Sequence, residues 1–108
     1  MGMSESEFLA AAERTLDEIE SAVESCDADI EISRAGNVLT LELADGSKVV
    51  VNSQAPMRQI WLAAKSGGFH YEWRDGAWCD TRDGSELFAT LSRVVSAQGG
   101  VALLLRPG

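Results

Sequence analysis

The sequence predicts an α+β fold in which two helices pack on one face of a single antiparallel β-sheet. Apolar residues recur at helical spacing only near the two ends of the chain, whereas the middle alternates apolar and polar residues in short runs, as strands do. Asp-Gly turns join some of these runs, which favours antiparallel neighbours. The free face of the sheet must then meet water or a partner. A chain of 108 residues has room for one such domain, expected over residues 1–108.

The first predicted element is a helix that begins after Ser4. Ser4 and Glu7 have the spacing of a capping box, in which each side chain accepts a hydrogen bond from the other residue's backbone. Apolar side chains then follow at steps of three and four, so they share one stripe of a helix that ends near Cys26. They are Phe8, Ala12, Leu16, Ile19, Val23 and Cys26.

Two strands are expected next, over Ile30–Ser33 and Val38–Leu43, with a turn at residues 34–37 between them. Asp45-Gly46 then marks a hairpin with either a two-residue or a three-residue loop. Only the three-residue loop, with Gly46 at a bulge, keeps apolar residues opposite one another, so we expect that register. Its pairs are Leu43 with Ser47, Leu41 with Val49 and Leu39 with Val51. The outer face would then hold Lys48, Val50, Asn52 and Gln54.

Three more strands are expected over Met57–Lys65, Phe69–Arg74 and Ala77–Thr81, with turns at residues 66–68 and 75–76. In the first of them, Ile60 and Leu62 alternate with Gln59 and Trp61.

A second helix should follow, because Asp83 and Glu86 have capping-box spacing and apolar residues recur behind them. The apolar positions are Leu87, Leu91 and Val94, with Val95 or Gln98. Gly99-Gly100 supplies a stop signal. Val101–Leu105 would be an apolar tail, extended or coiled against the core.

The formal net charge of −8 argues against nucleic acid and anionic lipid as partners, because both require basic surfaces. The N-terminus lacks the features of a signal or transit peptide, and no run is long enough to span a membrane, so a cytosolic location is expected. The two cysteines, Cys26 and Cys79, match no zinc motif and are expected to be small core residues.

The charge excess lies at one end of the chain. Residues 1–31 hold ten acids and one base, whereas residues 32–108 hold seven acids and eight bases. Glu13, Asp17, Glu20 and Glu24 fall within roughly 60° of one another around the predicted helix, beside its apolar stripe. We call these four residues, with Asp27, Asp29 and Glu31 after them, the acidic ridge. It could be a solvated face, a weak site for hard cations, or a docking surface for a basic partner.

Sequence motifs for catalysis are nearly absent, so the chain is not expected to be an enzyme. The single histidine, His70, could be an incidental surface residue or a contact. Trp61 should lie on the outer sheet face, where an exposed tryptophan is typical of a binding hot spot. The C-terminal tail could instead cover it. Trp73 and Trp78 are expected in the core.

The segment over residues 52–62 reads N-x-Q-x-P-x-x-Q-x-W-L, and this motif resembles the signature of the frataxin family. The following segment, Lys65–Tyr71, resembles bacterial members of the family, as do the hairpin over residues 45–48 and the acidic first helix. The resemblance covers essentially the whole chain, and its central motif is long and specific.

The resemblance implies a frataxin-like α/β sandwich, with two roughly parallel helices over an antiparallel sheet. It also implies a non-enzymatic, cytoplasmic bacterial regulator of iron–sulfur cluster assembly that docks on a cysteine desulfurase and a scaffold protein. Weak binding of iron, Fe2+ or Fe3+, is implied at the ridge, for which the matching family positions are Glu20, Glu24, Asp29 and Glu31. The implied partner-binding residues are Glu20, Glu24, Asn52, Gln54, Gln59 and Trp61, and we add the neighbouring His70.

Two departures from the family pattern bear on iron. Ser21 and Ser25 stand where bacterial relatives often carry acids, and the N-terminal segment lacks a histidine that some relatives supply to metal. Two alternatives therefore stay open, an iron donor or store with ferroxidase activity in an oligomer, and a generic acidic interaction domain. A monomer is expected, with iron-dependent oligomers as the alternative.

Overall fold

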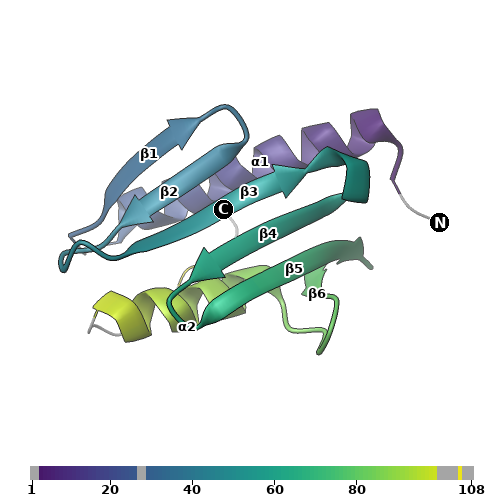
Figure 1. The fold of residues 1–108 in the computed structure, drawn as a ribbon. Coiled ribbons are helices and arrows are strands. Elements are labelled where there is room, and N and C mark those ends of the chain that lie inside the picture. The colour runs from purple at the N-terminus through teal and green to yellow at the C-terminus, as the bar shows by residue number, and fades with distance from the viewer. Residues whose placement is uncertain (1–2, 27–28, 100–104, 106–108) are drawn as a thin grey trace.

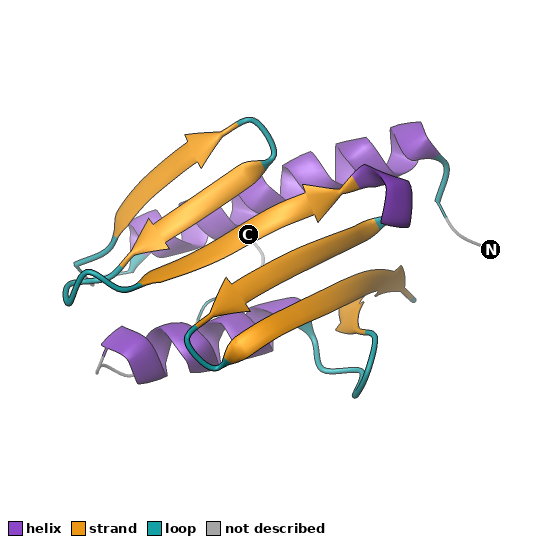
Figure 2. Ribbon diagram, viewed as in Figure 1, coloured by secondary structure: helices purple, strands orange, loops and turns teal. Residues whose placement is uncertain are grey.

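The computed structural model describes residues 3–26, 29–99 and 105, and it confirms the α+β fold. Six strands form one antiparallel sheet in the order β1-β2-β3-β4-β5-β6, and both helices cover the same face (Figure 1, Figure 2). No helix within the described ranges is long and apolar enough to cross a membrane. The elements are α1 (Glu5–Ser25), β1 (Glu31–Ala35), β2 (Val38–Glu42), β3 (Lys48–Gln54), the 3-10 helix η1 (Ala55–Met57), β4 (Gln59–Ala64), β5 (Gly67–Arg74), β6 (Ala77–Asp80) and α2 (Leu87–Gly99).

The N-terminus of α1 carries the predicted capping box. The backbone N–H of Ser4 donates to Glu7 Oε1 at 2.9 Å, and the Glu7 N–H donates to Ser4 Oγ at 3.1 Å. The hydrogen bond from the Ser4 backbone favours the charged form of the Glu7 carboxylate, so the pKa of Glu7 lies below its usual value. The predicted stripe is buried from Phe8 to Val23. Cys26 caps the end of the helix and, like Cys79, is half-buried with a free thiol, so neither cysteine is the core residue that we expected.

The β2–β3 hairpin has the register that burial predicts. Leu39 lies opposite Val51 and Leu41 opposite Val49, while the Leu43 N–H donates to the Ser47 carbonyl at 2.8 Å. Gly46 adopts φ +86°, a conformation that a side chain would disfavour.

Several predicted boundaries are wrong. β1 runs on through Arg34 to Ala35, so the turn is only two residues long. Pro56 sits in η1, which delays β4 to Gln59. β5 begins at Gly67, because the two glycines that suggested a turn pair with β4 instead.

The start of α2 also differs from the prediction. Asp83 accepts the Ser85 N–H at 2.9 Å in a local turn, whereas Glu86 itself caps the helix. Its carboxylate accepts the N–H groups of Phe88 and Ala89 at 2.9 and 3.1 Å.

The end of α2 and the predicted tail are described only in part. Gly99 still belongs to α2, while Gly100 and residues 101–104 lie outside the described residues. Leu105 is buried, and its N–H donates to Ser92 Oγ at 2.7 Å, which ties it to the helix layer.

One buried hydrogen bond joins α1 to the far edge of the sheet. Trp78 Nε1 donates to Thr15 Oγ1 at 2.7 Å, and the Thr15 hydroxyl donates to the Ala11 carbonyl at 2.8 Å. The Trp78 ring also meets Phe8 edge-on, with centroids 5.9 Å apart. Thr15 is therefore both a helix residue and the partner of a buried indole.

Replacing Thr15 by valine should lower the free energy of unfolding by about 1–3 kcal/mol, because the buried indole N–H loses its acceptor at nearly constant side-chain volume. Urea titration followed by circular dichroism measures this change. Thr15→Ser keeps the hydroxyl and should lose clearly less. Equal midpoints for wild type and Thr15→Val would contradict the role of this bond.

Candidate functional site

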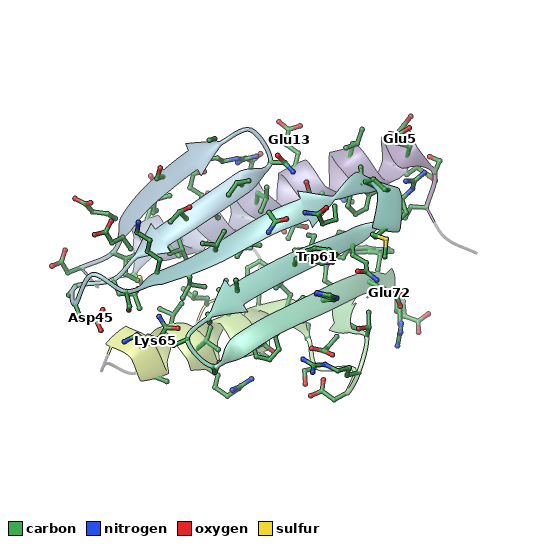
Figure 3. All side chains as sticks on the ribbon, in the orientation of Figure 1. Glu5, Glu13, Asp45, Trp61, Lys65 and Glu72 are labelled. Carbon is green, nitrogen blue, oxygen red and sulfur yellow. The ribbon has the colours of Figure 1, made fainter. Side chains whose placement is uncertain are left out.

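The acidic ridge runs along the side of α1 that borders β1. Glu13, Glu24 and Asp29 are exposed, and Glu13 projects from α1 beyond the sheet (Figure 3). Asp27 lies outside the described residues. The helical ridge positions are therefore accessible to a partner or to solvent ions.

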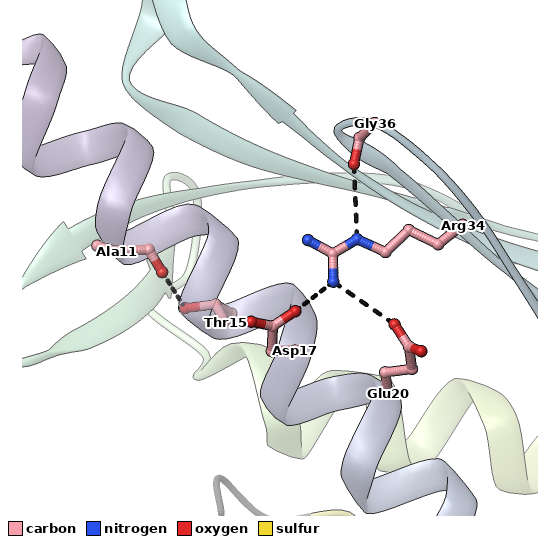
Figure 4. A network of polar contacts seen from close by, with 6 residues as sticks. All are labelled: Ala11, Thr15, Asp17, Glu20, Arg34 and Gly36. Carbon is pink, nitrogen blue, oxygen red and sulfur yellow. Dashed lines mark hydrogen bonds and ion pairs between the residues drawn. The ribbon is translucent and has the colours of Figure 1, made fainter.

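Arg34 on β1 lies against this ridge (Figure 4). Its Nη1 donates to Asp17 Oδ1 and to Glu20 Oε1, the latter at 3.5 Å, and its Nε donates to the Gly36 carbonyl at 3.5 Å. The hydrogen bond that Arg34 donates to Asp17 is the main cause that raises the pKa of Arg34, and the contact with Glu20 adds to it. The centre of the ridge thus carries an internal counter-ion.

Sequence reasoning missed Arg34, because it lay in the nearly neutral part of the chain and in an expected turn. Alternation along β1 could have found it, since Ile32 and Arg34 share the face that meets α1.

The described residues of the ridge do not form an enclosed metal site. Within residues 3–26, 29–99 and 105, no three His, Cys, Asp or Glu side chains converge closely enough to hold an ion. Asp17 and Glu20 are engaged by Arg34, whereas Glu13 and Glu24 face water. Separate exposed carboxylates fit a hard cation that keeps most of its water shell, and they do not fit tight coordination.

Glu31 lies round the edge of the sheet, on the outer face. It stands directly opposite Glu42, which in turn pairs with Lys48 across the β2–β3 hairpin. The two glutamates line a shallow hollow, and like charges placed opposite each other repel. Sequence reasoning did not single out Glu42. Together with Glu31 it extends the negatively charged surface from the edge strand β1 onto the outer face of the sheet.

The outer sheet face brings the predicted partner-binding residues together. Asn52, Trp61 and His70 are consecutive partners across β3, β4 and β5. The Trp61 and His70 rings stack with centroids 4.4 Å apart and planes 14° from parallel. Trp61 Nε1 donates to Gln59 Oε1 at 2.8 Å, and Gln54 Nε2 donates to Asn52 Oδ1 at 2.6 Å.

We call these five residues (Asn52, Gln54, Gln59, Trp61, His70) the amide–aromatic face. Trp61 is half-buried and His70 is exposed, so the prediction that Trp61 lies on the outer face is confirmed. Figure 3 shows Trp61 on the side of β4 that faces away from the helices. Preset hydrogen bonds and a stacked pair limit the rotamer entropy that binding would cost.

The prediction for Trp73 is wrong. Trp78 is buried as expected, but Trp73 is 37% exposed at the end of β5. Trp73 shares the inner face with Tyr71, but it lies next to the end of β5, where fewer core residues cover the sheet.

Comparison with known proteins gives one consistent result. Residues 1–101 match the model of the frataxin-like domain. A Cupriavidus metallidurans protein named iron–sulfur cluster assembly protein CyaY is 55% identical over 108 residues, covering 96% of this chain and 97% of that protein. The protein of that name from Cupriavidus taiwanensis is 59% identical over 106 residues, covering 94% and 95%.

Two solved structures extend the likeness to the fold. Frataxin from Psychromonas ingrahamii, studied as part of the CyaY family, superposes with a TM-score of 0.90 at 34% identity, covering 96% of this chain and 99% of that one. Trimeric yeast frataxin, solved with ferrous iron, has a TM-score of 0.67 at 27% identity, covering 93% and 89%.

Proposed function

This chain belongs to the frataxin-like family, and we propose that it is a non-enzymatic accessory and regulator of iron–sulfur cluster assembly in the bacterial cytoplasm. The names of its bacterial relatives support the pathway. The observation that carries the proposal is the position of two exposed surfaces of different chemistry. The helical part of the acidic ridge and the amide–aromatic face lie on adjacent sides of the molecule, and Glu31 on β1 and Glu42 on β2 lie between them.

The two surfaces suit two partners. The ridge would dock on a basic surface of the cysteine desulfurase, because exposed carboxylates attract such a surface at long range and fix its orientation. The amide–aromatic face would meet the scaffold protein, since a tryptophan surrounded by amides supplies apolar area together with directional hydrogen bonds. One molecule could then span both partners and alter the rate at which they assemble a cluster.

Iron would be an effector or cargo at the ridge. The spacing of the exposed acids supports only weak, water-rich binding of Fe2+ or Fe3+. The ferrous complex of the yeast trimer favours a second candidate, an oligomeric iron donor or store with ferroxidase activity. In either role iron is exchanged and is not held as a resident cofactor.

The decisive experiment is cluster assembly on the scaffold, with and without this protein, while the desulfurase concentration is varied. A regulator should change the rate in a manner that depends on the desulfurase concentration and should not deliver its own labelled iron. Transfer of pre-loaded iron-57 into the cluster in proportion to the protein added would support the donor instead.

Replacing Arg34 by methionine should tighten Fe2+ binding at the ridge about fivefold. A unit charge at about 4 Å is worth about 1 kcal/mol in water, and the substitution frees Asp17 and Glu20 from their internal counter-ion. Anaerobic titration followed by amide chemical shifts on α1 measures the affinity.

The matched control is Arg74→Met, which removes an arginine paired with Glu72 on the sheet and should leave iron binding unchanged. If Arg34→Met and Arg74→Met bind iron with the same affinity, the ridge is not the iron site.

A further inference from the structure

A third surface lies apart from the acidic ridge and the amide–aromatic face. A hollow of about 360 Å³ is lined by residues of the β5–β6 hairpin, of α1 and of the segment that begins α2. Its wall contains aromatic, small and charged side chains. Those used below are Trp73, Trp78, Arg14, Glu18 and Glu86.

The aromatic part of this hollow is already ordered. Trp73 meets Trp78 edge-on, with centroids 5.1 Å apart and planes at 71°. Trp78 is held in the core by its bond to Thr15, so it gives Trp73 a fixed support. Trp73 nevertheless stays 37% exposed, so part of its indole is available for contact with another molecule.

The charges around Trp73 favour a cation. Glu18 is half-buried on α1, and the carboxylate of Glu86 is fixed by its two hydrogen bonds to the α2 N-terminus. The ring contacts of the described residues join aromatic side chains to one another, and none places a lysine or arginine on Trp73. Among the described residues that line the hollow, Arg14 carries the positive charge, and it is exposed.

We propose that this hollow binds the side chain of an arginine presented by a partner protein. A guanidinium is planar, so it can stack on an indole while its edge donates hydrogen bonds to carboxylates. Trp73 supplies the indole, and Glu18 and Glu86 supply the carboxylates. The inference does not depend on the function proposed above, because it uses neither the ridge nor the amide–aromatic face.

N-acetyl-arginine amide is the probe, and indole and backbone N–H chemical shifts are the readout. We expect saturable millimolar binding with shifts at Trp73, Gly76 and Ala77. N-acetyl-citrulline amide, which is neutral and nearly isosteric, should bind several-fold more weakly, and N-acetyl-lysine amide should fall between the two.

The variants separate stacking from charge. Trp73→Ala should weaken binding roughly fivefold and Trp73→Phe less, as expected for a cation on a partly exposed ring. Glu18→Gln should weaken binding several-fold, whereas Arg14→Gln should strengthen it about two- to fivefold by removing the competing charge. Backbone shifts elsewhere in each variant report whether the fold is intact.

Three results would overturn the proposal. They are equal affinities for the arginine and citrulline probes, unchanged affinity in a folded Trp73→Ala variant, and shifts confined to the ridge positions on α1.

Discussion

Reversing Glu20 and Glu24 to lysine should weaken binding to the cysteine desulfurase at least about tenfold at low salt. Each reversal replaces an attraction to a basic surface with a repulsion, and each such contact is worth about 1 kcal/mol at 4 Å in water. Glu24 is exposed and Glu20 is partly exposed, so both can face a partner. Isothermal titration or biolayer interferometry at two salt concentrations measures the loss, which should shrink as salt rises.

The control must change the net charge equally on the same helix. Glu5→Lys, Ser6→Lys and Ala10→Lys together do so, because all three positions are exposed on the N-terminal half of α1 and precede Glu13, the first residue of the ridge. This triple variant should keep most of the affinity. If it loses as much affinity as the ridge variant, the attraction depends on net charge alone and the ridge is not the docking site.

Truncating Trp61 to alanine should weaken binding to the scaffold protein about thirtyfold, which corresponds to the 2 kcal/mol or more typical of a hot spot. The truncation removes the stacked partner of His70 and the donor to Gln59, so it disorders the amide–aromatic face at its centre. The free energy of unfolding should change by less than about 1 kcal/mol, because the ring lies outside the core. Affinity by titration and stability by urea unfolding together test this.

Leu9→Ala is the matched control for Trp61. Leu9 is 47% exposed on α1, on the layer opposite the sheet face, so its truncation should leave scaffold binding unchanged. Trp61→Phe should retain part of the affinity. Scaffold binding that survives Trp61→Ala intact would place the interface elsewhere.

The features that could be predicted from sequence are those that one local pattern determines. The Ser4–Glu7 capping box needs only three-residue spacing, and the β2–β3 register needs only the demand that Leu41 stay buried. Alternation also placed Trp61 on the outer face. In each case the alternative local structure would have a much less favourable free energy, because it would bury less apolar surface or make fewer hydrogen bonds.

The failures arise where two patterns compete or where distant segments meet. Asp83 has the spacing to cap with Glu86, but its turn with Ser85 and the bridge between Cys79 and Glu86 leave Glu86 as the cap. The Arg34 contact joins β1 to α1 across 17 positions of sequence, so no local spacing shows it. Trp73 lies on the inner side of β5 but at the rim, which periodicity cannot distinguish from the centre of a strand.

The strand order of the sheet repeats the order of the chain, and this has a kinetic consequence. Each strand pairs with its predecessor, so every pairing closes a short loop and the sheet can form by successive hairpins at low entropic cost. The Thr15–Trp78 bond, by contrast, spans 63 positions and can form only when α1 docks on the far edge. We therefore expect Thr15→Val to accelerate unfolding while leaving the refolding rate nearly unchanged. That result would mean that the docking of α1, and not the formation of the sheet, sets the lifetime of the native state.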